Sequence, residues 1–214
     1  MRPIAFAMKT VMPKTKNQEK FVQAMYSKTP IIFAIGPAGS GKTLLACQIG
    51  LQQLKHHEVK KLVLTRPATS AGEEHGFLPG TLEKKMGPWM QPLMDAFTLR
   101  GTDIERMKKQ EQLEIAPFAY MRGRTFDNSW IIADEMQNAT ESQLKMLLTR
   151  LGQNSKIIVT GDLDQCDILN SGLQNFLDSA CSEEHLEYIE IIELESDDIV
   201  RHAAVAEVLS IYNN

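Results

Sequence analysis

Cysteine, long apolar runs and excess positive charge are all scarce in this chain of 214 residues. Its three cysteines, Cys47, Cys166 and Cys181, lie far apart and indicate neither a disulfide framework nor the paired spacing of a zinc site. Apolar runs such as residues 30–35 are far shorter than the roughly 20 residues that span a bilayer. The apolar stretch at the N-terminus is too short for a signal peptide. We therefore expect a soluble, cytoplasmic protein with no membrane partner.

Basic residues do not outnumber acidic ones. The chain has 23 Lys and Arg residues against 27 Asp and Glu residues, a net charge of −4. A protein whose whole surface binds nucleic acid is usually basic. Any binding of nucleic acid must therefore come from a local patch, or from a groove that forms when copies of the chain assemble.

Repeats, low-complexity tracts and Gly/Ser linkers are absent, so we predict a single domain over residues 1–214. Short apolar runs alternate with longer helical patterns, which favours an α/β fold with a mostly parallel sheet and helices on both faces. Strands are predicted at 31–35, 62–64, 130–133, 156–160 and 188–194, and helices at 42–55, 141–151 and 197–212. Residues 67–112 are rich in proline and poor in β-branched residues, and we interpret them as an insertion of turns and short helices.

The strongest motif follows the first predicted strand. Residues 36–43 read Gly-Pro-Ala-Gly-Ser-Gly-Lys-Thr and fit the P-loop pattern G-x-x-x-x-G-K-[ST], with a strand before it and a helix after it. In such a loop backbone N–H groups surround phosphate oxygens at a helix N-terminus. Lys42 would reach the β- and γ-phosphates, and the Thr43 hydroxyl would bind Mg²⁺. The predicted nucleotide-binding residues are Gly36, Pro37, Ala38, Gly39, Ser40, Gly41, Lys42, Thr43 and Leu44.

Two further groups of polar residues follow apolar strands. Asp134 and Glu135 end the strand at 130–133, which puts their carboxylates at the carboxyl edge of the sheet beside the P-loop. We predict that Asp134 holds Mg²⁺ and that Glu135 deprotonates the attacking water; the alternative is a strand end with two solvated acids. Gln165, after Gly161-Asp162, is a weaker candidate that would contact the γ-phosphate or the water, because Gly-Asp turns after strands are common.

These motifs resemble those of a known superfamily. Lys42-Thr43, Asp134-Glu135 and Gly161-Asp162-x-x-Gln165 resemble motifs I, II and III of superfamily 1 helicases, and Asn17-Gln18 resembles the motif by which those enzymes read adenine. Nearly the whole chain resembles the PhoH family of P-loop ATPases, and its short form is similar to phage-encoded members. The supporting stretches are 14–18, 65–68, 71–73, 76–80, 121–126, 148–152 and 200–202.

The resemblance implies a RecA-like fold and two further site residues. Gln18 would read adenine, although without the resemblance it is an ordinary surface glutamine on a helix. Arg201 would act as an arginine finger on the ATP of a neighbouring subunit. The alternative is that Arg201 pairs with a nearby aspartate on the surface. Arg150 is a second candidate for the arginine finger, and a purely structural role is a stronger alternative for it than for Arg201. Ala203 stands where the family usually has proline.

An assembly is expected because superfamily 1 enzymes place ATP between two RecA-like halves and this chain has room for one. A second copy would supply the missing wall in a head-to-tail ring, and PhoH relatives are associated with hexamers. A basic channel within an acidic exterior would then bind a single strand. Candidates for its lining are Lys84-Lys85, Arg106 with Lys108-Lys109, and Arg122 and Arg124 with Tyr120 and Phe126.

Three classes of function remain open at this point. The favoured class is a Mg²⁺-dependent ATPase coupled to single-stranded RNA or DNA. The second is an ATP-driven adaptor that remodels a protein partner without nucleic acid. The third is a small-molecule kinase, which Glu135 and Gln165 disfavour because both suit hydrolysis better than phosphoryl transfer.

Overall fold

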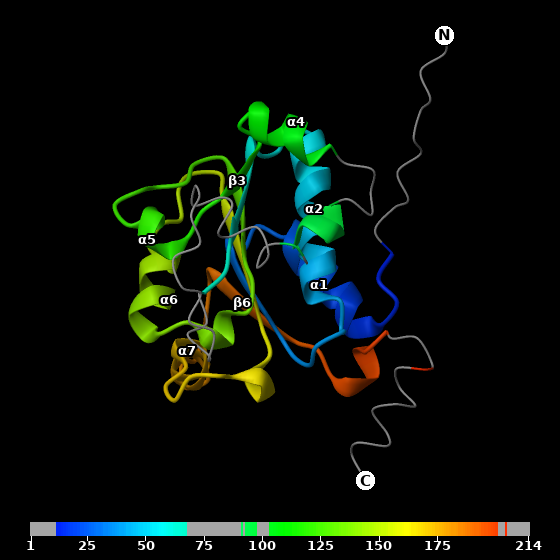
Figure 1. Cartoon of the computed structure of the whole chain (residues 1–214). Helices are drawn as coiled ribbons and strands as arrows, with labels where there is room; N and C mark the ends of the chain where they lie inside the picture. Colours follow the sequence, from blue (N-terminus) through cyan, green and yellow to red (C-terminus); the bar gives the residue numbers. More distant parts are fainter. Residues whose placement is uncertain (1–11, 68–90, 92, 98–102, 201–203, 205–214) are drawn as a thin grey trace.

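The computed structural model describes residues 12–67, 91, 93–97, 103–200 and 204, drawn in colour in Figure 1. Arg201, the Lys84-Lys85 pair and most of the predicted insertion at 67–112 lie outside the described residues. None of the helices in the described part combines the length and the apolar character that a membrane span requires.

In the part of the chain that the structure describes, six parallel strands form one sheet in the order β3-β2-β4-β5-β1-β6. The strands are β1 (Ile31–Ile35), β2 (Lys61–Thr65), β3 (Leu113–Ile115), β4 (Ser129–Ala133), β5 (Lys156–Gly161) and β6 (Ile189–Glu193). Because all of them run the same way, the segments that follow them meet at one edge of the sheet. The sheet therefore gathers the P-loop after β1, Asp134 after β4 and Asp162 after β5.

Helices cover both faces of the sheet, as predicted (Figure 1). Strand side chains alternate between the faces: Trp130 and Ile132 of β4 pack in one hydrophobic cluster, and Ile131 and Ala133 pack in the other. The first cluster is completed by α1 (Lys16–Tyr26), α2 (Lys42–Lys55) and α4 (Ile104–Lys109). The second is completed by α5 (Phe118–Met121), α6 (Glu141–Leu148) and α7 (Gly172–Ala180).

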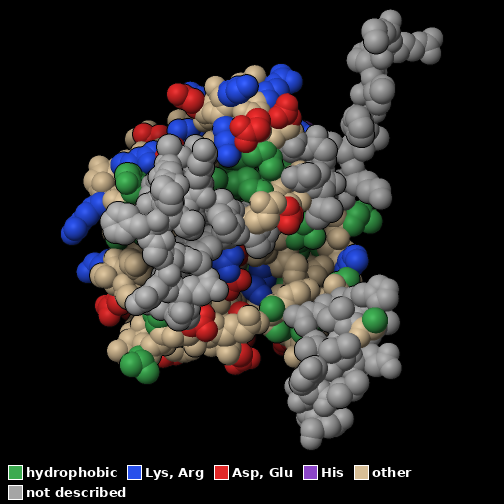
Figure 2. Space-filling model, in the orientation of Figure 1, with side chains coloured by type: hydrophobic (Ala, Val, Ile, Leu, Met, Phe, Trp, Pro, Cys, Tyr) green, Lys and Arg blue, Asp and Glu red, His purple; other side chains and the backbone are tan. Residues whose placement is uncertain are grey.

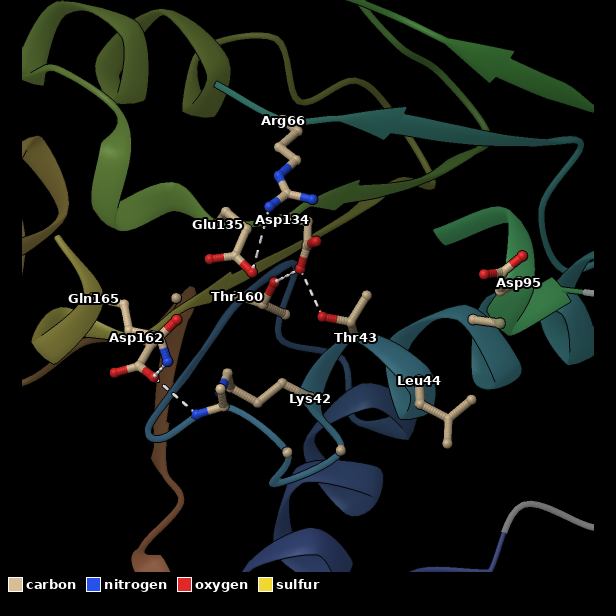
Figure 3. A pocket seen from close by; sticks show the side chains of 15 residues that line it. Lys42, Thr43, Leu44, Arg66, Asp95, Asp134, Glu135, Thr160, Asp162 and Gln165 are labelled. Atoms are coloured by element: carbon tan, nitrogen blue, oxygen red, sulfur yellow. Dashed lines mark hydrogen bonds and ion pairs between the residues drawn. The ribbon is translucent and has the colours of Figure 1, made fainter. Parts of the chain in front are cut away.

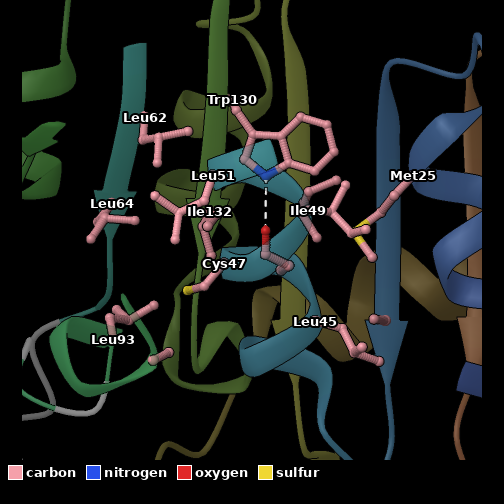
Figure 4. Packing of buried hydrophobic residues seen from close by; sticks show 14 of the residues in the cluster. Met25, Leu45, Cys47, Ile49, Leu51, Leu62, Leu64, Leu93, Trp130 and Ile132 are labelled. Carbon is pink, nitrogen blue, oxygen red and sulfur yellow. Dashed lines mark hydrogen bonds between the residues drawn. The ribbon is translucent and has the colours of Figure 1, made fainter. Parts of the chain in front are cut away.

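The P-loop helix α2 is fixed tightly against β4. The indole N–H of Trp130 donates to the carbonyl of Ala46 over 3.2 Å, as Figure 4 shows. A Cβ at Gly50 would lie 2.6 Å from the Trp130 ring, so the helix approaches the strand as closely as glycine permits. Both aromatic burial and a satisfied N–H hold the middle of α2 against β4.

Some details of the sequence-based prediction are wrong, and helix α7 was not predicted. Strand β3 was not predicted, because it has three residues and a charged Glu114 between two apolar ones. Its pairing with β2 makes it the edge strand. The last helix does not begin at Asp197: Ser196–Asp198 form a 3-10 turn, and Ile199 follows in an extended conformation.

Candidate nucleotide-binding site

The P-loop joins β1 to α2 in a conformation that needs its glycines. Gly41 is the N-cap of α2 with φ 87°, a left-handed backbone that costs side-chain-bearing residues free energy. Gly36 has φ 148°, and a Cβ there would lie 2.1 Å from the carbonyl oxygen of Leu194. The loop is therefore pressed against the chain that follows β6, and the Val200 N–H donates to the Gly39 carbonyl over 3.2 Å.

Lys42 is folded back onto its own loop. Its ammonium donates to the carbonyls of Gly36 and Pro37 over 2.6 and 2.8 Å and to the Ser40 hydroxyl over 3.2 Å. Burial lowers the pKa of Lys42, and the nearby carboxylates, Asp162 foremost, act in the opposite direction. These three oxygen atoms hold the Lys42 ammonium at a place where phosphate oxygens could take over as its acceptors.

Asp134 lies between two hydroxyls at the end of β4. Thr43, at the start of α2, and Thr160, on β5, each donate to Asp134 Oδ1 over 2.6 Å (Figure 3). Asp134 is only 4% exposed, so these contacts fix a carboxylate in a nearly closed position. The arrangement offers hard oxygen donors, which suit Mg²⁺.

Glu135 has an unusual backbone and two neighbours for its carboxylate. Its φ of 54° and ψ of 40° are left-handed, an uncommon conformation for a residue with a side chain that often marks functional sites. Gln137 donates to Oε2 over 2.6 Å, and Arg66 lies 3.7 Å from Oε1. Figure 3 shows the Arg66 guanidinium directed at this carboxylate.

Asp162 ties the third predicted motif to the P-loop. Its Oδ2 accepts from the Ala38 N–H over 2.8 Å and from Gln165 Nε2 over 2.7 Å. Gln165 lies in the short 3-10 turn Leu163–Gln165 directly after β5. The side chain predicted to contact the γ-phosphate or the water therefore stands at the same edge as Lys42 and Asp134.

These residues line one cavity of about 470 Å³. Its walls include the predicted residues Ala38, Gly39, Gly41, Lys42, Thr43, Leu44, Asp134, Glu135 and Gln165. They also include Arg66, Asp95 and Ala96, which we did not predict as site residues. Arg66 follows β2 at the same sheet edge, and this position after a strand could have identified it from the sequence as a site residue. The volume is within the range of ligand pockets.

Gln18 lies behind the P-loop and is not among the residues that line the cavity. It is 4% exposed, not a surface residue. Its amide donates to the carbonyls of Ser40 and Asp198 over 2.9 and 3.3 Å, and its Oε1 accepts from the Lys14 N–H over 2.8 Å. In this structure the side chain connects α1, the P-loop and the 3-10 turn after β6.

Asp198 is the second anchor of that connection. Its carboxylate accepts hydrogen bonds from the Thr15 hydroxyl, from Asn17 over 2.9 Å and from the Glu195 N–H over 2.7 Å. Burial acts to raise the pKa of Asp198, but these hydrogen bonds outweigh it, so the pKa is lowered. The carboxylate is therefore held ionised in a buried position.

Three of the other candidates, Arg150, Arg124 and Phe126, have structural contacts. Arg150 donates to the carbonyls of Arg124 and Met146 over 2.9 and 3.1 Å, consistent with the structural alternative. Arg124 pairs with Glu114 over 2.5 Å and stacks on Phe126, which is 4% exposed. In the same group Tyr120 is 58% exposed and the Arg124 side chain 38%, so the buried Phe126 is the member that a strand could not reach.

Charged side chains around α4 are mixed in sign. Lys108 pairs with Glu105 over 3.5 Å, and Figure 2 shows basic and acidic side chains side by side over this helix. A mixed surface attracts phosphate less than a basic one does.

A metal at the sheet edge would need ligands beyond the protein. Within the described ranges, no group of three or more His, Cys, Asp or Glu side chains could hold a metal ion. Mg²⁺ commonly binds through one or two carboxylates together with substrate phosphates and water. The Thr43 and Asp134 oxygens fit that mode and would not make a complete metal site alone.

The model of the PhoH-like protein family matches residues 10–213. The chain belongs to the PhoH family. It is 46% identical over 210 residues to the PhoH-like protein of Bacillus subtilis, covering 96% of this chain and 65% of that protein. It is 38% identical over 207 residues to the protein PhoH of Escherichia coli, covering 95% of this chain and 58% of that protein. This PhoH-like chain thus spans roughly three-fifths of such relatives.

The same fold occurs in a solved protein of another kind. The large terminase of a thermophilic bacteriophage superposes with a TM-score of 0.55 at 12% identity, over 93% of this PhoH-like chain and 50% of the terminase chain. This similarity confirms the predicted RecA-like P-loop architecture and nothing finer.

Proposed function

We propose that this chain binds ATP with Mg²⁺ and hydrolyses it. The observation that carries the proposal is the cavity in which Lys42 and Thr43 of the P-loop face Asp134, Glu135 and Gln165. The PhoH-family match over residues 10–213 supports the same activity.

Nucleotide binding is assigned to the P-loop. The Lys42 ammonium would exchange the carbonyls of Gly36 and Pro37 for β- and γ-phosphate oxygens, and backbone N–H groups at the start of α2 would donate to the same phosphates. Gln18 would read adenine with the remaining lone pair of Oε1, since both hydrogens of its amide are already donated.

Hydrolysis is assigned to the two acids after β4 and to Gln165. Thr43 and Asp134 would hold Mg²⁺, which when bound neutralises charge on the phosphate oxygens. Glu135 would orient a water and take its proton, and Gln165 would hydrogen-bond the water or the γ-phosphate. The contacts of Glu135 with Gln137 and Arg66 leave its carboxylate in a defined position before substrate arrives.

Turnover would be coupled to single-stranded RNA or DNA in a homo-oligomeric, hexameric ring. The resemblance of Lys42-Thr43, Asp134-Glu135 and Gly161-Asp162-x-x-Gln165 to superfamily 1 helicase motifs supports a partner of this class, and the exposed Tyr120 offers a stacking surface. The second candidate is an adaptor that remodels a protein without nucleic acid. It is favoured by the mixed charge around α4 and by the buried position of Phe126.

The deciding experiment measures ATP hydrolysis with Mg²⁺, alone and with single-stranded RNA or DNA, together with the mass in solution. Glu135→Gln should bind ATP with native affinity and lose turnover by about 100-fold or more, whereas Lys42→Ala should lose binding. Native turnover in Glu135→Gln would remove it as the base. Stimulation by a strand supports the first partner class, and an indifferent rate supports the adaptor.

The role of Arg201 in a ring is testable by mixing variants. Arg201→Ala leaves its own P-loop intact, and Lys42→Ala keeps Arg201. If Arg201 acts on the neighbouring subunit, two preparations that are each inactive should regain turnover when mixed. Failure to regain any activity in a mixed oligomer would remove Arg201 from the site of its neighbour.

A further inference from the structure

The 3-10 turn directly after Glu135, Met136–Asn138, is buried although two of its three side chains are polar. Gln137 is 1% exposed and Asn138 is 7% exposed. Buried amides cost free energy unless they are hydrogen-bonded, so the partners of these two side chains indicate what the turn is for.

Gln137 joins the proposed base to the segment that carries Gln165. Its Nε2 donates to Glu135 Oε2 over 2.6 Å and to the backbone carbonyl of Gln165 over 3.4 Å. Its Oε1 accepts from the Asp162 N–H over 3.1 Å. A single buried side chain thus contacts the segments after β4 and after β5.

The contact with Glu135 is the closer of the two that its carboxylate makes with neighbouring side chains. Gln137 lies 2.6 Å from one oxygen, while Arg66 lies 3.7 Å from the other. Glu135 also has a left-handed backbone, so its direction depends on its surroundings more than a regular residue's would. Reaction rates are sensitive to such placement: a misplacement of about 1 Å can cost roughly 100-fold.

Asn138 makes a separate connection between the same two segments. It donates to the Asp167 carboxylate over 3.1 Å and accepts from the Asp167 N–H over 2.8 Å. Neither atom contacts Glu135 or Gln165. The neighbouring residue therefore provides a matched control with similar burial, the same turn and an amide of the same chemistry.

We propose that Gln137 is a positioning residue that holds Glu135 and Gln165 in register for attack of water on the terminal phosphate. This inference rests on the proposed ATP hydrolysis. Through Asp162, whose carboxylate accepts from the Ala38 N–H of the P-loop, the same side chain connects the base to the phosphate-binding loop.

The decisive variant is Gln137→Glu. It keeps the side-chain length and the acceptor for the Asp162 N–H, but it replaces the donor that faces Glu135 with a repelling carboxylate. We expect kcat for ATP to fall by about 100-fold while the Kd for ATP, measured by equilibrium binding, changes less than about threefold. Asn138→Ala should keep kcat within about threefold of the wild type, because its contacts do not reach the base.

Two further variants keep the inference falsifiable. Gln137→Met has a similar side-chain length and no charge, so it replaces Gln137→Glu in the test if the buried carboxylate unfolds the turn. It should also lower kcat by about 100-fold. Adding Gln137→Glu to Glu135→Gln should lower turnover little further, since a positioning residue has no effect once the base is gone. Native kcat in a folded Gln137 variant, or equal losses in Asn138→Ala, would overturn the inference. Lack of turnover in the wild-type chain would overturn the proposed ATPase as well.

Discussion

The Thr43 hydroxyl donates to the Asp134 carboxylate over 2.6 Å and so joins the first turn of α2 to the end of β4. The two residues are 91 positions apart in sequence. The contact brings together the two side chains proposed to hold Mg²⁺.

Asp134→Asn should test the charge of this pair without removing its shape. The asparagine Oδ1 still accepts from Thr43 and Thr160, so the local hydrogen bonds survive while the metal-binding charge is lost. We expect ATP turnover to fall about 100-fold and the Mg²⁺ concentration for half-maximal rate to rise. A Mg²⁺ titration of turnover measures both. Thr160→Val, which loses one hydrogen bond and no charge, should show the smaller effect, and an unchanged Mg²⁺ requirement in Asp134→Asn would contradict the assignment.

Gly36→Ala should destabilise the fold through the close approach of the P-loop to Leu194. The new Cβ would lie 2.1 Å from the Leu194 carbonyl oxygen, so one of the two segments must move. We expect a loss of about 2–3 kcal/mol in the free energy of unfolding, measured by urea denaturation. Gly123→Ala is the control, because Gly123 also has a positive φ of 77° but no atom within 4 Å of its Cβ, and it should cost only about 1 kcal/mol. Equal losses would show that contact with Leu194 does not restrict position 36.

Most of the sheet could be predicted from sequence because its central strands are continuous apolar runs. Strands β1, β4 and β5 are buried on both faces, and Thr160 is the one polar residue in their interiors. Strand β3 lacks that pattern: Glu114 pairs with Lys61 and Arg124 at the sheet edge, so its residues alternate and it is too short to recognise.

The position of a site residue could be predicted where the residue follows a strand and belongs to a motif. On that basis the P-loop, Asp134 and Gln165 were predicted at one edge of the sheet. Arg66 obeys the same rule and lies in the stretch 65–68 that resembles the family, but that stretch gave its arginine no role in the site. The contact between Gln18 and Asp198 joins residues 180 positions apart, and no local pattern encodes such a pair.

Gln18→Ala should separate base recognition from support of the P-loop. Loss of the bonds to the Ser40 and Asp198 carbonyls loosens the loop and should raise KM for every nucleotide. Loss of adenine reading should in addition reduce the preference for ATP over GTP. We expect KM for ATP to rise by about tenfold, the value of one or two hydrogen bonds, with a smaller rise for GTP. Equal rises for both nucleotides would limit Gln18 to a structural role.

The lowered pKa of Lys156 predicts that the stability of the fold depends on pH. The Lys156 ammonium donates to the carbonyls of Ser27 and Ala24 over 2.8 and 3.4 Å, at the end of α1. Burial lowers the pKa of Lys156 from 10.5 to about 8, while the Glu190 carboxylate acts in the opposite direction. Between these two values the folded chain has lost the proton and the unfolded chain still binds it. The free energy of unfolding contributed by this residue therefore rises with pH across that window.

Lys156→Met should remove this rise. Urea denaturation at several pH values from about 7.5 upward would compare the slope of the unfolding free energy in the variant and in the wild type. Lys28→Met is the matched control, because Lys28 is exposed and lines a surface cavity together with Lys156, and it should keep the wild-type slope. Below a pH of about 8 the folded chain carries the cost of a half-buried charge, so the variant should be at least as stable as the wild type there. Parallel curves for Lys156→Met and the wild type would mean that the amine keeps its usual proton affinity in the fold.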